Sequence, residues 1–189
     1  MKKRAFEKLK MDVAAYYQDN GLQGKFSIVK LILIVDFWPV FYYRLLEYCR
    51  ERPSLIRQVI KSILVVFKPI VNGMSGARIS PGATIGGGVL LHQSTGVLIA
   101  SGTVIGENCT FFSGTCVVYK ANSKGSGAPI IGDNVKLMVG CKVIGEVRVG
   151  NDTFVGANAV VVTDIPSYSI AVGVPAKSSP RRDDSGAKI

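Results

Sequence analysis

The stretch from residue 131 to residue 161, IGDNVKLMVGCKVIGEVRVGNDTFVGANAVV, decides the fold. An aliphatic residue returns at every sixth position of this stretch: Ile131, Leu137, Val143, Val149, Val155 and Val161. Six residues are too few for a helical repeat, but they suffice for one short strand and one turn. A fixed short period predicts a solenoid, in which the aliphatic residue of each repeat points inward and stacks on its counterpart in the next coil.

The same period extends upstream of this stretch. Aliphatic residues recur at Ile79, Ile85, Leu91 and Val97 and, after a two-residue shift, at Ile99, Ile105, Phe111 and Val117. A small or β-branched residue, which would fit a tight corner, often stands four positions later: Ala83, Val89, Thr95, Cys109, Thr115, Val135, Cys141, Thr153 and Ala159. Residues 119–129, YKANSKGSGAP, interrupt the pattern and predict a loop that leaves the solenoid.

The chain before the repeats is expected to be helical. We predict a first helix over residues 2–17, a long apolar helix over residues 26–50 that Pro39 should kink or divide, and a third helix after Pro53. We therefore divide the chain into a helical region (1–72), a solenoid (73–177) and a C-terminal tail (178–189).

The third predicted helix is both basic and amphipathic. Arg57, Lys61 and Lys68 fall on one side of it, with Ile, Val and Leu elsewhere. A helix of this kind can lie on an anionic membrane surface. The alternative is that its apolar face packs against the protein's own body or against a sister subunit.

Composition limits the classes of partner. The net charge of +10 favours anionic partners, but the basic residues are scattered without interleaved aromatic residues, so we expect no nucleic acid partner. The four cysteines form no CxxC pair and there is one histidine, so we expect no metal site. We expect no signal peptide, and no apolar run reaches the roughly 18 residues of a membrane span, so the predicted location is the cytoplasm, with membrane contact at most peripheral.

From about residue 76 to residue 181, the chain resembles the hexapeptide-repeat acyltransferases. The resemblance is closest to the serine acetyltransferases and the related O-acetyltransferases of cell-surface sugars. It is carried by GATIGGGVLLHQSTGVLIASGTVIGENCTF (82–111), by residues 128–162 and by AVGVPAK (171–177). It implies a mainly β fold, a left-handed parallel β-helix preceded by a small helical region. It also implies a homotrimer, acetyl-CoA as co-substrate and a histidine that removes a proton from an acceptor hydroxyl.

His92, the only histidine, is the candidate catalytic base. An alcohol is a poor nucleophile until a base takes its proton, and a neutral imidazole suits that task near neutral pH. Serine acetyltransferases typically read Asp-His-x-x-Gly where this chain reads HQSTG (92–96), so His92 stands one position from the catalytic histidine of that pattern. No aspartate adjoins it to orient the ring, and Glu107, Ser94 and Ser113 are the candidate substitutes.

The resemblance also suggests the residues that contact the two substrates. Gln93, Ser94 and Ser113 are expected to contact the acceptor. Glycine-rich repeats let backbone approach a ligand closely, and the predicted acetyl-CoA contacts are Gly140, Ala157, Gly173 and Lys177. Because coenzyme A carries several phosphate charges, Lys142, Arg181 and Arg182 are further candidates for binding it.

Three departures from the serine acetyltransferase pattern bear on the acceptor. They are the displaced histidine, Ala128 in place of a second histidine before Pro129, and a short helical region. They favour a hydroxyl of a saccharide or polysaccharide precursor as the acceptor. Serine O-acetyltransferase is the alternative, because serine acetyltransferases dock into the next enzyme of cysteine synthesis through a C-terminal isoleucine and this chain ends in Ile189. The third hypothesis for the function is a non-catalytic scaffold that kept the β-helix.

Overall fold

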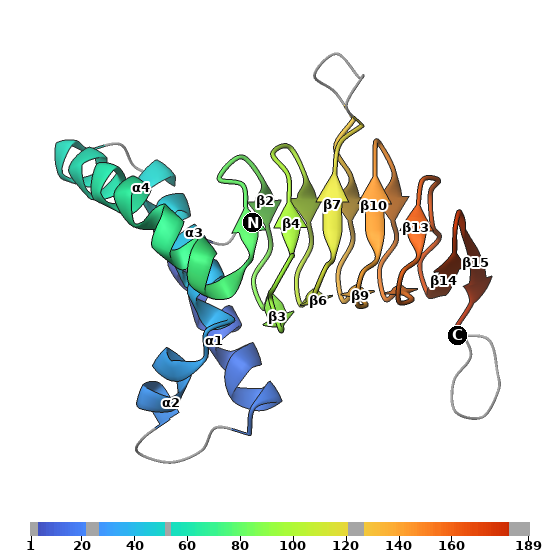
Figure 1. Ribbon diagram of the computed structural model, residues 1–189, viewed down its shortest axis with the longest axis horizontal. Helices are drawn as coiled ribbons and strands as arrows, with labels where there is room; N and C mark the ends of the chain where they lie inside the picture. The colour runs from blue at the N-terminus through green and yellow to red at the C-terminus, as the bar shows by residue number, and fades with distance from the viewer. Residues whose placement is uncertain (1–3, 22–26, 52–53, 121–126, 182–189) are drawn as a thin grey trace.

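The computed structural model describes residues 4–21, 27–51, 54–120 and 127–181. Figure 1 shows helices gathered at one end of a long prism of strands. The helices are α1 (Ala5–Asp19), α2 (Ser27–Leu33), α3 (Phe37–Glu51) and α4 (Leu55–Ser75). The helical region therefore ends three residues beyond the division that we placed after residue 72.

The strands form three sheets, which are the three faces of the prism. Face A has the order β1-β4-β7-β10-β13, face B the order β11-β8-β5-β2, and face C the order β15-β14-β12-β9-β6-β3. From β1 to β13, successive strands pass from one face to the next, and all neighbours pair in parallel except β14 and β15. This is the left-handed parallel β-helix that the six-residue period predicts, and that prediction is confirmed.

The strands themselves are short, as a period of six residues requires. Their bounds are β1 (Arg78–Ile79), β2 (Thr84–Ile85), β3 (Leu90–His92), β4 (Leu98–Ile99), β5 (Val104–Ile105), β6 (Thr110–Phe112), β7 (Cys116–Val118), β8 (Ile130–Ile131), β9 (Lys136–Leu137), β10 (Lys142–Ile144), β11 (Arg148–Val149), β12 (Phe154–Val155), β13 (Val160–Val161), β14 (Ser169–Gly173) and β15 (Ala176–Pro180).

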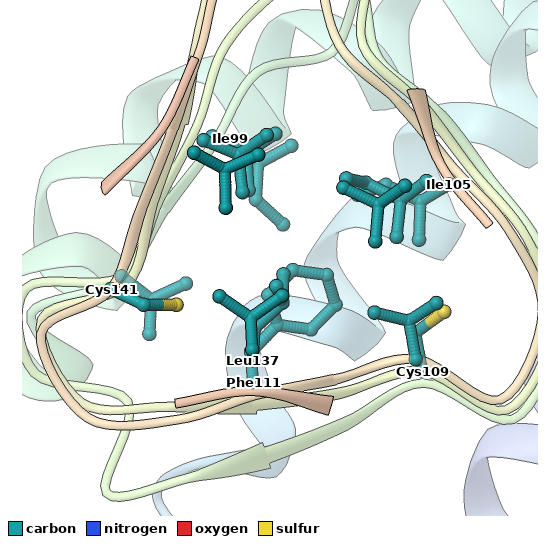
Figure 2. Close-up of a cluster of buried hydrophobic side chains, with 14 of the residues drawn as sticks. Ile99, Ile105, Cys109, Phe111, Leu137 and Cys141 are labelled. Carbon is teal, nitrogen blue, oxygen red and sulfur yellow. The ribbon is translucent and has the colours of Figure 1, made fainter. Parts of the chain in front are cut away.

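The core consists of the stacked aliphatic residues. Figure 2 shows Ile99 from face A, Ile105 from face B and Phe111 from face C meeting at the prism axis, with Cys109 and Cys141 in two of the corners. These five side chains are at most 2% exposed. Each coil thus buries one aliphatic or aromatic residue per face and one small residue per corner, which is the arrangement expected from the sequence.

One detail of the predicted register is wrong. The two extra residues lie in the corner between β3 and β4, before Val97 and not after it. Leu98 pairs with Cys116 and Ile99 with Val117, so Val97 occupies the corner position that Thr115 fills in the next coil. Val97 is accordingly buried, whereas Thr95, which we expected in that corner, is exposed.

The helical region departs from expectation at Pro39. The long apolar segment is divided, as predicted, but at residues 34–36, so Pro39 lies in the first turn of α3, where its missing N–H costs nothing. Helix α4 continues through Pro69 and ends at Ser75, where Gly76 adopts φ +69°. None of the helices in the described ranges is long and apolar enough to cross a membrane.

A buried ion pair joins the helices to the first coil of the prism. Arg44 of α3 is 1% exposed, and its Nε lies 2.7 Å from the carboxylate of Asp12 in α1. The same guanidinium donates to the backbone carbonyls of Ile85 and Gly86. Asp12 in turn accepts the N–H of Val89 at 2.9 Å. The pair therefore connects two helices to the backbone at the end of β2 and just after it.

Replacing Arg44→Met would leave the Asp12 carboxylate buried without its cation. We expect the free energy of unfolding to fall by about 3–5 kcal/mol, measured by urea denaturation. Arg148→Met, at an exposed position on face B, is the control and should change it by less than about 0.5 kcal/mol. An Arg44 variant as stable as the control would show that the pair does not secure the helices.

The cysteines are free thiols, and their burial controls their reactivity. Burial raises the pKa of the Cys109 thiol to about 12 and that of Cys141 to about 11, and the reactive species is the thiolate. At mildly alkaline pH we expect a thiol reagent to label the half-buried Cys116 first, and Cys109 and Cys141 only on unfolding. Peptide mapping after timed labelling measures the order, and equal rates at Cys109 and Cys116 would contradict it.

Candidate active site

His92 lies at the end of β3 on the outer side of face C. Side chains alternate along a strand, and Leu91 points into the core, so His92 points outward. Its side chain is 31% exposed. The imidazole stacks on the ring of Phe112 in the next coil, with ring centroids 4.8 Å apart and an interplanar angle of 17°. The stack restricts how the ring can turn.

The carboxylate beside His92 comes from helix α1. Oδ1 of Asp19, the last residue of α1, lies 3.4 Å from Nε2 of His92. A carboxylate at one ring nitrogen can orient an imidazole and leave the other nitrogen to accept a proton. Sequence reasoning missed Asp19, because it considered only neighbours within the repeats and nothing in the sequence relates the end of this helix to β3.

Asp36 holds the turn that follows His92. Its two carboxylate oxygens accept the N–H groups of Gln93, at 3.0 Å, and Ser94, at 2.8 Å. Gln93 adopts φ +49° and is exposed next to the histidine. Ser94 is buried, and its hydroxyl donates to the carbonyl of Ser75 at 3.0 Å, so this hydroxyl is used to join the turn to the end of α4. Among the predicted acceptor contacts, only Gln93 adjoins His92 with its side chain exposed.

An open pocket of about 430 Å³ surrounds the imidazole. Its walls include Asp19 from α1, Asn108, Thr110 and Phe112 from the second coil, and Lys136 from β9; the other lining residues are Ala15, Gln18, Gly88 and Leu90. The pocket therefore offers a carboxylate, an ammonium group and an imidazole to one ligand. A larger pocket of about 680 Å³ lies over face A near Lys68 and Arg78, but its lining includes no imidazole or carboxylate.

The predicted contacts for acetyl-CoA follow one edge of the prism, where face C turns into face A. The strand register places three of these predicted contacts, Gly140, Ala157 and Gly173, at or beside this edge in successive coils. Two of the predicted acceptor contacts, Gln93 and Ser113, lie at the same edge in the preceding coils. Neighbouring strands are spaced by about 4.8 Å, so the four steps from the level of His92 to that of Gly173 cover about 19 Å. An extended ligand lying along the edge would meet backbone from every coil.

Glycines make this edge narrow. Gly96, Gly114 and Gly140 all have positive φ, and a Cβ added at Gly114 would lie 3.4 Å from the Cα of Gly140. Ser113 accepts the N–H of Gly140 at 2.8 Å through its backbone carbonyl. The edge is thus a ladder of backbone groups with small side chains.

Basic side chains lie along and beyond the edge. Lys142 donates from Nζ to the carbonyl of Gly140 at 3.0 Å. Lys177 is exposed on β15, opposite Val172, and Arg181 is exposed just after that strand. Arg182 lies outside the described residues, as does Ile189. Over the part of the chain that the structure describes, no group of three or more His, Cys, Asp or Glu residues could hold a metal ion.

Comparison with known proteins identifies relatives over most of the chain. The family described as bacterial transferase hexapeptide (six repeats) matches residues 128–163. A serine acetyltransferase of Helicobacter pylori strain J99 is 40% identical over 161 residues, which cover 85% of this chain and 90% of the relative. A serine acetyltransferase of Staphylococcus aureus strain Mu50 is 38% identical over 101 residues, 53% of this chain and 47% of that protein. This chain thus matches about half the length of the Staphylococcus relative.

Solved structures share the fold. A serine acetyltransferase from Neisseria gonorrhoeae superposes with a TM-score of 0.76 at 24% identity, over 96% of this chain and 69% of the other. A Brucella abortus serine acetyltransferase in complex with coenzyme A gives a TM-score of 0.76 at 23% identity, over 91% and 66% of the two chains.

The role of Asp36 can be tested through the single histidine, whose ring protons give isolated NMR signals. Asp36→Ala should free the turn and weaken the stack on Phe112, moving these signals toward the positions of an unstacked imidazole. Asp164→Ala is the matched control, since Asp164 accepts a backbone N–H at 2.8 Å on another face. Unchanged signals in the Asp36 variant would show that the turn keeps its shape without this carboxylate.

Proposed function

Since this chain belongs to the serine acetyltransferase family, we propose that it acetylates the hydroxyl of serine. Its activity is acetyl-CoA-dependent O-acetyl transfer, which the relatives share. The sequence favoured a saccharide as the acceptor and kept serine as the alternative. The relatives support serine better than a saccharide. A saccharide is the second candidate acceptor, because His92 stands one position from the family pattern and Ala128 replaces a second histidine.

The observation that carries the serine proposal is the pair of opposite charges in the pocket of His92. Free serine is a zwitterion with an ammonium group, a carboxylate and a hydroxyl. Asp19 suits the ammonium group, Lys136 suits the carboxylate, and His92 would then receive the hydroxyl. A neutral saccharide hydroxyl would not need the two charges.

In the proposed reaction His92 accepts the proton of the serine hydroxyl while the oxygen attacks the thioester carbonyl of acetyl-CoA. The tetrahedral intermediate then expels the thiolate of coenzyme A, which takes up a proton, and O-acetylserine remains. Oδ1 of Asp19 orients the imidazole and stabilises the imidazolium that forms, which leaves the second oxygen of this carboxylate for the ammonium group of serine. The backbone edge from Ser113 to Gly173 would bind the acetyl-CoA arm, with Lys142, Lys177 and Arg181 near its phosphates.

We place this reaction in a homotrimer, the assembly that the family resemblance implies. The pocket is open, and apolar side chains stand exposed near the same edge, notably Val139, Val172 and Val174. A neighbouring copy covering them would also close the pocket and exclude water from the thioester.

The test is release of coenzyme A from acetyl-CoA, measured with serine and with a panel of saccharides and nucleotide sugars. We expect serine-dependent release by the wild type. His92→Ala should lower kcat about 10²–10⁴-fold, because it removes the general base. Lys136→Met should raise the KM for serine more than it lowers kcat, because Lys136 binds serine and takes no part in proton transfer.

Arg148→Met, on face B, is the control and should keep wild-type kinetics. Faster release with a saccharide than with serine would replace the proposed acceptor with the second candidate. Equal rates for wild type and His92→Ala would assign the base to another group. If the folded protein released no coenzyme A with any acceptor, the result would support the hypothesis of a non-catalytic scaffold.

A further inference from the structure

The pocket over face A gathers positive charge. It has a volume of about 680 Å³, which lies in the range of sites for small organic ligands. Its two cations come from different elements, Lys68 from α4 and Arg78 from β1. Among the described residues, none that lines the pocket is acidic, and none forms an ion pair with either cation. Two cations that approach one space without a counter-charge favour an anionic ligand there.

Uncharged hydrogen-bonding residues line the same pocket. They are Asn72, Ser80 and Ser101. The hydroxyl oxygen of Ser80 accepts the N–H of Gly82 at 3.3 Å, so the hydroxyl hydrogen remains to be donated to a ligand. A guanidinium pairs with two oxygens of a phosphate group, and hydroxyl and amide groups hydrogen-bond to the hydroxyls of a sugar. This combination suits a phosphate joined to a sugar better than a bare anion.

The part of the pocket beyond the cations is apolar and reaches an aromatic ring. Arg78 pairs with Leu98 in the next coil, and Val118 lies one coil further along face A. Tyr119, which also lines the pocket, follows Val118 and is 55% exposed. Figure 1 shows β4 and β7, which carry this wall, as neighbours on one face of the prism. Two strand spacings cover about 10 Å, so the lining suits a ligand with an anionic group at one end and a flat apolar group at the other.

We propose that the pocket over face A binds a nucleoside phosphate. The phosphate lies between Lys68 and Arg78, the ribose lies beside the serine hydroxyls, and the base covers the apolar wall and stacks on Tyr119. The pocket shares no lining residue with the pocket of His92, which is formed by α1 and face C. The proposal therefore goes beyond acetyl transfer and does not rest on the choice of serine as the acceptor.

A nucleoside phosphate can reach this pocket from two sources. One source is a free nucleotide. The other is the nucleotide end of coenzyme A, which the proposed function places near Lys177 and Arg181 at the far end of the prism. Both sources present a phosphate, a ribose and a base, so the chemistry of the pocket is the same for both. Competition between a nucleotide and coenzyme A separates the two sources.

Isothermal titration calorimetry with adenosine 5′-monophosphate (AMP), adenosine and inorganic phosphate tests the class of ligand. AMP should bind the wild type at least about tenfold more tightly than adenosine, because adenosine lacks the phosphate that makes charge-assisted hydrogen bonds to the two cations. Binding of AMP should weaken as salt is raised, since salt screens these exposed charges. AMP should also bind more tightly than inorganic phosphate, which leaves the apolar wall and the ring of Tyr119 uncovered.

Single substitutions locate the binding site. Arg78→Gln and Lys68→Met should each weaken AMP binding at least about tenfold. The matched controls are Arg148→Gln on face B and Lys61→Met on α4, because both residues are exposed cations that do not line the pocket, and both variants should bind AMP as the wild type does. Tyr119→Ala should weaken AMP binding about fivefold or more and leave phosphate binding unchanged. Circular dichroism checks that each variant is folded.

AMP that binds the wild type no more tightly than adenosine would overturn the proposal. AMP binding that survives both Arg78→Gln and Lys68→Met would also overturn it, since another surface would then hold the phosphate. AMP binding to protein saturated with coenzyme A supports the pocket as a site for a free nucleotide. Displacement of AMP by coenzyme A, with weaker coenzyme A binding by Arg78→Gln, supports it as the site of the nucleotide end. These titrations contain no acceptor, so their outcome is separate from a failure of the serine assignment.

Discussion

The buried guanidinium of Arg44 determines how the helical region meets the β-helix. An uncovered end of a β-helix presents a row of unpaired backbone groups, and burying them without partners costs free energy. Arg44 donates to the carbonyls of Ile85 and Gly86, while Asp12 accepts the N–H of Val89. Two helices are thereby fixed to the first coil through hydrogen bonds to its backbone.

The same attachment sets the geometry around His92. Asp12 and Asp19 both belong to α1, so the helix that Asp12 ties to the first coil runs along face C and ends beside the imidazole. The hydroxyl of Tyr16, which lies between them in α1, donates to the backbone carbonyl of Asp36 and accepts the N–H of Leu91. Asp36 then holds the turn after His92. The candidate active site is therefore supported from the helical region as much as from the repeats.

The six-residue repeat allowed the β-helix to be predicted from the sequence. A six-residue period with small residues at fixed offsets predicts the coils, the inward residues and the outward position of most others, because each position in a coil has the same environment as its counterpart in the next. Periodicity says nothing about the contacts that break it. Three features depend on packing between the helices and the first coil, whose residues are far apart in the sequence. They are the two extra residues before Val97, the burial of Ser94 and the position of Asp19 beside His92.

The contacts between the helices and the first coil also account for the surroundings of His92. In the Asp-His-x-x-Gly pattern that the family resemblance supplies, the histidine stands where this chain has Gln93, which lies in the corner with its backbone held by Asp36. One position earlier, a side chain belongs to β3 and points out of face C, toward α1 and Phe112. An imidazole moved to that position loses a neighbouring aspartate in the sequence but gains Asp19 in space. The proposed base and its carboxylate therefore come from different parts of the chain, His92 from β3 and Asp19 from the helical region.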